Sequence, residues 1–168
     1  MTPRARSLPP TIAVGDRFST KTTLTRRSIA EFARACGDDN PVHTNDDAAR
    51  SWGFAGVIAS GPQTSALFGA LLAKHYGKFG PTLGLELSVR FLQAVFPDLP
   101  LRLAWEVVAV EHNEKLGGQL VSLQGSVEQS GHAVISGRAK IVVRPRASAE
   151  DAARRRGDRL LSARPLRG

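Results

Sequence analysis

The chain has 168 residues, of which 42% are hydrophobic and 23% are charged, and its formal net charge is +8. This length suits one globular domain with a substantial core, and no stretch approaches the roughly 20 consecutive apolar residues that a membrane-spanning helix needs. The single cysteine excludes an internal disulfide, and four scattered histidines exclude a Cys/His cluster for a structural metal. Because MTPRARSLPP lacks the apolar region of a signal peptide, we expect a cytoplasmic protein.

The positive charge is concentrated at the ends of the chain. Residues 144–168 carry eight arginines against three acidic side chains, whereas residues 7–143 carry 13 basic and 12 acidic side chains, a net charge of +1. The folded part is therefore close to neutral, and an arginine-rich segment without aromatic residues is typical of a solvated tail. We expect three parts: an N-terminal lead (1–13), one folded domain (14–145) and a basic, flexible tail (146–168).

The domain begins with a short strand and a capped helix. The Gly-Asp turn and the Thr-rich alternation of residues 14–24 predict the strand. Thr25 can cap the helix that follows, and Gly37 can end it. Its apolar residues recur every three or four positions, so we expect them to be buried as one stripe. They are Ile29, Phe32, Ala33 and Cys36.

A second, shorter helix and a buried helix come next. Asn45 suits the cap of the short helix, and Gly53 suits its end. Residues 60–77, SGPQTSALFGALLAKHYG, are apolar on nearly every side, which indicates a buried helix. Pro62 suits its first helical position.

From residue 83 onward the apolar period changes from that of a helix to that of a strand. Four consecutive strands with one apolar face follow the buried helix, separated by turn-forming residues. An antiparallel sheet curled around that helix would bury both. The sequence therefore predicts an α+β protein with the hot-dog fold.

The stretch CGDDNPVH, residues 36–43, combines ionisable groups with a turn. Asp38 and His43 lie five residues apart in a loop bent by Pro41, and a carboxylate and an imidazole brought together there can hold and activate one water molecule. This chemistry needs no metal. In the alternative interpretation, Asp38 and Asn40 only bond to the turn backbone, and His43 is a surface residue. The spacing leaves both interpretations open.

The start of the buried helix offers the other half of a site. Gly61 follows Ser60 at the N-terminus of that helix, where a backbone N–H at the positive end of the helix dipole can bind the oxygen of a polarised carbonyl. Together with the Asp38 and His43 pair, this donor suits the addition of water to, or its removal from, a carbon chain activated by a thioester.

Residues 29–61, IAEFARACGDDNPVHTNDDAARSWGFAGVIASG, resemble the hydratase motif of the MaoC-like, or (R)-specific, enoyl-CoA hydratases and dehydratases. Every defining position of GDDNPVH is filled, and the resemblance extends over about residues 14–143. It implies a hot-dog fold with a dimeric core. It also implies that Asp38 and His43 are the catalytic pair, that Asn40 supports them, and that the amide of Gly61 is the oxyanion donor.

The activity implied by the resemblance is the reversible syn hydration of a trans-2-enoyl thioester to the (3R)-hydroxyacyl thioester, without a cofactor or a metal. The thioester would be carried on CoA or on acyl carrier protein, and the protein would be a homodimer or a higher homo-oligomer.

Two departures from the family pattern keep other functions open. Family members commonly have a histidine before the helix glycine and a bulky apolar residue after it, where this chain has Ser60 and Pro62. A catalytically silent hot-dog subunit that binds or scaffolds a partner is therefore an alternative. The segment FLQAVFPDLPLR also lacks the usual turn. A third hypothesis is RNA or membrane binding through the arginine-rich tail.

Overall fold

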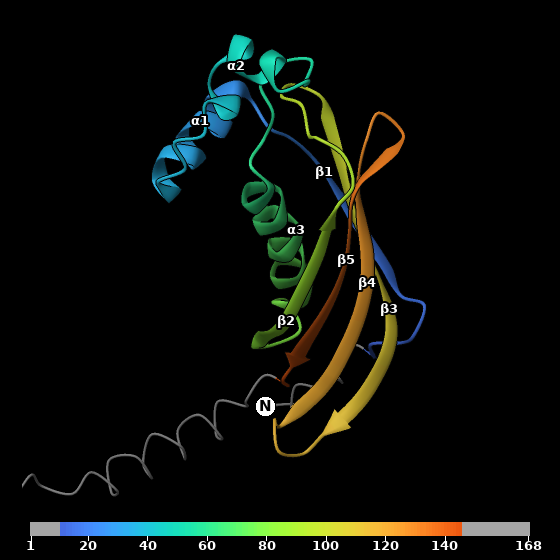
Figure 1. The fold of residues 1–168 in the computed structure, drawn as a ribbon. Coiled ribbons are helices and arrows are strands. Elements are labelled where there is room, and N and C mark those ends of the chain that lie inside the picture. Colours follow the sequence, from blue (N-terminus) through green and yellow to red (C-terminus); the bar gives the residue numbers. More distant parts are fainter. Residues whose placement is uncertain (1–10, 146–168) are drawn as a thin grey trace, which may run out of the picture.

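A computed structural model describes residues 11–145 (Figure 1). The predicted tail, 146–168, and all but the last three residues of the predicted lead lie outside the described residues. The elements in chain order are β1 (Arg17–Thr23), α1 (Arg26–Cys36), a 3-10 turn η1 (Pro41–His43), α2 (Asp46–Ser51), α3 (Gly61–Tyr76), β2 (Thr82–Phe91), β3 (Pro100–Asn113), β4 (Gly118–Gln129) and β5 (His132–Val143).

The five strands form one antiparallel sheet in the order β1-β3-β4-β5-β2. The sheet curves around α3, while α1 and α2 lie together beyond one end of α3 (Figure 1). This arrangement confirms the predicted hot-dog fold. Within residues 11–145, no helix is both long enough and apolar enough to cross a membrane.

Aromatic stacking between α3 and the sheet forms the centre of the core. The rings of Phe68 and Trp105 lie 3.9 Å apart and nearly parallel, and the Trp105 indole N–H donates to the Phe68 carbonyl at 2.9 Å. Gly125 and Gly137 pair across β4 and β5 beneath the Phe68 ring. A Cβ atom at these positions would approach the ring to 2.9 and 2.7 Å, respectively. The two glycines therefore let the helix pack closely against the sheet.

The predicted burial of Cys36 is wrong. Ile29 and Ala33 are buried, but Cys36 is exposed. The reason is that the core covers only the first two turns of α1, and Cys36 lies one turn beyond Ala33, at the last position before Gly37 ends the helix. Helical spacing identified the apolar side of α1, but it could not show how many turns of that side the core would bury.

Strand β2 forms one edge of the sheet and exposes an unusual number of apolar side chains. Leu83, Leu85, Leu87 and Phe91 are each between 46% and 54% exposed. The opposite edge, β1, is rich in threonine. Because exposed apolar edge strands invite pairing with another chain, β2 is the edge at which a partner would be expected.

Replacement of Phe68 by alanine tests the aromatic core. Phe68 is fully buried, so Phe68→Ala should lower the free energy of unfolding by about 3–5 kcal/mol, measured by urea denaturation. Val108 is 41% exposed, and Val108→Ala should change it by about 0.5 kcal/mol or less. Equal losses in the two variants would contradict this description of the core.

Candidate active site

Asp38 is placed by the end of α1. Gly37 adopts a left-handed conformation with φ 69°, and its N–H donates to the Arg34 carbonyl at 3.1 Å. The N–H of Asp38 donates to the Ala33 carbonyl at 2.8 Å. These two bonds form the Schellman motif, in which glycine accepts the positive φ without strain. The helix end therefore fixes the backbone of Asp38.

In the turn that follows, one carboxylate oxygen of Asp38 accepts a backbone hydrogen bond, and the other oxygen does not bond to the turn. Asp38 Oδ1 accepts from the Asn40 N–H at 3.2 Å, and Asn40 Oδ1 accepts from the Val42 N–H at 3.3 Å. Pro41 then opens the 3-10 turn that ends at His43. The predicted turn bonds of Asp38 and Asn40 are thus present, and they orient Asp38 Oδ2 toward the histidine.

His43 is buried at 7% exposure, so its interpretation as a surface residue is wrong. Its Nε2 lies 3.3 Å from Asp38 Oδ2, and its Nδ1 lies 2.8 Å from the Ile58 carbonyl oxygen. Because a carbonyl can only accept, Nδ1 must carry the proton, and Nε2 of the neutral imidazole is then an acceptor. Nε2 and the carboxylate oxygen are two adjacent acceptors, and a water molecule can donate one hydrogen to each.

The carbonyl of Ile58 is held by the segment around it. The Ile58 N–H donates to the Val42 carbonyl at 3.1 Å. One residue earlier, the Val57 N–H donates to Asp46 Oδ1 at 2.9 Å, and Arg26 Nη2 donates to that same oxygen at 2.9 Å. The hydrogen bond from Arg26, followed by that from Val57, lowers the pKa of Asp46 from its ordinary value.

Asp46 is therefore a positioning residue that links α1, α2 and the segment before α3. As an acidic residue in the first turn of α2, Asp46 also suits the positive end of that helix, so the link is a second role. A signal for the second role is Gly56, where a Cβ atom would lie 2.8 Å from Asp46 Oδ1. Glycine at that position gives the carboxylate room to reach the Val57 amide.

The start of α3 lies three residues after Ile58. Gly61 is its first residue, Pro62 its second, and Ser60 is the N-cap, 2% exposed and without a side-chain capping bond. The Gly61 N–H is among those that a helix leaves without an intrahelical partner. A Cβ atom at Gly61 would lie 2.8 Å from the Phe91 ring, so a larger residue there would require that ring to move.

The described residues contain no group of three or more His, Cys, Asp or Glu side chains that could hold a metal ion. A depression of about 860 Å³ lies on the sheet face opposite α3, and a pocket of about 200 Å³ lies near Phe79 and Val143. Neither includes Asp38, His43 or Gly61.

Comparison with known proteins identifies the family to which the chain belongs. Residues 11–129 match the family model described as "MaoC like domain". This chain belongs to the MaoC-like dehydratase family. A UPF0336 protein of Streptomyces avermitilis is 33% identical over 148 residues, covering 83% of this chain and 91% of the relative.

Two further similar proteins have more specific names. The 3-hydroxyacyl-thioester dehydratase X of Mycobacterium tuberculosis is 40% identical over 72 residues, covering 43% of this chain and 24% of that protein. The structure of R-hydratase PhaJ1 from Pseudomonas aeruginosa superimposes with a TM-score of 0.68 at 29% identity, covering 81% of this chain and 84% of that one.

The hydrogen bonds of Asp46 make the free energy of unfolding depend on pH. Because the pKa of Asp46 is lower in the folded chain than its unfolded value of about 3.9, its contribution is complete above that value and disappears as the pH falls through the folded pKa. Asp46→Asn should therefore be less stable than the wild type at pH 6 and nearly equal to it at pH 2, measured by urea denaturation. Asp39, which is exposed, provides the control Asp39→Asn. A difference that grows toward low pH would contradict the proposed role.

Proposed function

We propose that the chain is an (R)-specific enoyl-thioester hydratase and 3-hydroxyacyl-thioester dehydratase that adds water reversibly to trans-2-enoyl thioesters. The observation that carries this proposal is the pair of adjacent acceptors, His43 Nε2 and Asp38 Oδ2, 3.3 Å apart. The Nδ1 proton is donated to the Ile58 carbonyl, so Nε2 and the carboxylate are both left to accept a proton. Membership of the MaoC-like family supports the same chemistry.

The reaction balances with the residues present. The oxygen of the bridging water attacks C3 of the enoyl chain while the Asp38 and His43 pair takes up one of its protons. The same pair returns a proton to C2, so hydrogen and hydroxyl add to the same face of the double bond. Elimination of water follows the same steps in reverse.

Negative charge develops on the thioester oxygen as C3 is attacked. The Gly61 N–H, at the positive end of α3, is the proposed donor to that oxygen. Ser60, whose hydroxyl makes no capping bond, is proposed to support the substrate beside it. Asn40 supports the pair by holding the Asp38 turn.

We infer a homodimer assembled through β2. Its edge position and half-exposed leucines favour contact with a second copy. Phe91, at the end of β2, lies against the start of α3 at Gly61. A dimer formed there would therefore place the second copy beside the proposed site and help to enclose an acyl chain carried on CoA or acyl carrier protein.

Loss of either member of the pair should abolish catalysis without unfolding the chain. We expect Asp38→Asn and His43→Ala to lower kcat/KM for crotonyl-CoA by about 10²-fold or more, followed by the loss of ultraviolet absorbance of the conjugated thioester. Asp39→Asn, one residue away and exposed, should retain activity. Full activity in either pair variant would refute the assignment.

Substrate range provides the complementary test of the wild type. Acyl chains from short to long should be presented on both CoA and acyl carrier protein. If none is hydrated, the chain is a catalytically silent hot-dog subunit that binds or scaffolds a partner.

Charged residues on β2 should separate the proposed dimer. Leu85→Arg combined with Leu87→Arg replaces two half-exposed leucines and should shift the mass measured by light scattering to that of one chain, with reduced hydratase activity. Val108 is similarly exposed on β3, and Val108→Arg should leave the dimer intact. A wild type that is monomeric at micromolar concentration would contradict the inference.

A further inference from the structure

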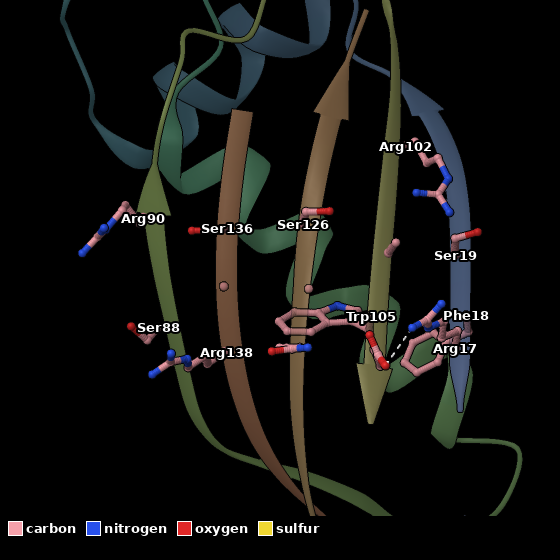
Figure 2. A pocket seen from close by; sticks show the side chains of 15 residues that line it. Arg17, Phe18, Ser19, Ser88, Arg90, Arg102, Trp105, Ser126, Ser136 and Arg138 are labelled. Carbon is pink, nitrogen blue, oxygen red and sulfur yellow. Dashed lines mark hydrogen bonds and ion pairs between the residues drawn. The ribbon is translucent and has the colours of Figure 1, made fainter. Parts of the chain in front are cut away.

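The outer face of the sheet carries a groove that runs across the strands (Figure 2). Its floor is a row of small side chains placed side by side by the strand register. Ser136 pairs with Ser126, Ser126 with Ala104, and Ala104 with Ser19. Direct partners project to the same face of a sheet. With strands about 4.8 Å apart, this row of four side chains on four strands is about 14 Å long.

Long, charged side chains border this floor. On one side the register aligns Arg138 with Gln124, Gln124 with Glu106, and Glu106 with Arg17. On the other side Arg102 reaches over the floor near Ser19 (Figure 2). Each border lies two residues from the floor row, so the borders are about 13 Å apart. The floor and these borders line the depression of about 860 Å³.

Arg90 closes the β2 end of the row, where it pairs with Ser136. The lining therefore contains four arginines and one carboxylate. Arg17 pairs with Glu106 at 3.0 Å, and Arg102 pairs with Glu128 at 3.5 Å. Among residues 11–145, neither Arg90 nor Arg138 forms an ion pair. The near-neutral domain thus concentrates uncompensated positive charge on this face.

We propose that this transverse groove docks an acidic α-helix of a partner protein. An α-helix is about 10–12 Å across and fits between the borders, and the floor of about 14 Å matches about 9 residues of such a helix. Its carboxylates would accept charge-assisted hydrogen bonds from Arg90 and Arg138 and further bonds from the serine hydroxyls.

Other occupants fit the groove less well. A second copy would oppose one positively charged face to another, which disfavours association. Single-stranded nucleic acid needs exposed aromatic rings for base stacking. The aromatic rings of the lining are otherwise engaged: Trp105 is 1% exposed, and Phe18 stacks on His75 at 3.7 Å.

The groove and the proposed active site lie on opposite faces of the sheet. Asp38, His43 and Gly61 belong to the side on which α3 packs, whereas the floor and border side chains of the groove, such as Ser126 and Arg138, project from the other face (Figure 2). Docking therefore leaves the thioester site accessible. The proposal stands or falls independently of the hydratase activity.

A fluorescein-labelled helical peptide of about 14 residues, with glutamates spaced i, i+4 along one side, provides the probe. Its fluorescence anisotropy should report binding to the wild type at about 150 mM salt, and the same peptide with glutamine in place of glutamate should not bind. Titration should shift the NMR amide signals of Ser126 and Ser136.

Arg90→Glu combined with Arg138→Glu should weaken binding of this peptide by at least about tenfold. The matched control is Arg34→Glu combined with Lys115→Glu, which makes the same change in net charge at exposed positions away from the groove. Equal weakening in both double variants, or no binding by the wild type, would overturn the proposal. Tighter binding of a DNA duplex or of 3′,5′-ADP to the groove would also overturn it, because the natural ligand would then be a phosphate.

Discussion

The site depends on one hydrogen bond, from His43 Nδ1 to the carbonyl of Ile58 at 2.8 Å. Without it, either ring nitrogen could carry the proton, and a proton on Nε2 would be donated to Asp38. With it, Nε2 and the carboxylate remain joint acceptors, which the proposed activation of water requires. The bond in turn depends on the segment that Asp46 and Val42 hold in place.

The fold and the proposed site share the same helix. The middle of α3 carries Phe68, whose stacking on Trp105 joins the helix to the sheet, and its first residue, Gly61, offers the amide proposed to bind the thioester oxygen. The path into α3 also passes through Ile58. The packing that stabilises the domain therefore also holds the helix start from which Gly61 would act.

The helix boundaries were predictable from the sequence, because they depend on interactions between neighbouring residues. Each predicted capping residue lies at a helix boundary and bonds only to residues close to it in the sequence: Thr25, Gly37 and Asn45. The partner of His43 was not predictable, because a backbone carbonyl carries no sequence signal. Alternation likewise identified the apolar residues of β2, but it could not show that the edge position leaves them half exposed. The groove was also not predictable, because its residues come together only through the pairing register of strands that are distant in the sequence.

The tautomer of His43 is the most direct test of the proposed proton-accepting pair. Nitrogen-15 NMR of the imidazole signals, assigned by comparison with His43→Ala, distinguishes a protonated from an unprotonated ring nitrogen. We expect neutral His43 to carry its proton on Nδ1 and to have an unprotonated Nε2 facing Asp38. A neutral ring protonated on Nε2 would contradict it, because His43 would then donate to the carboxylate directly and could not share the acceptance of a water proton.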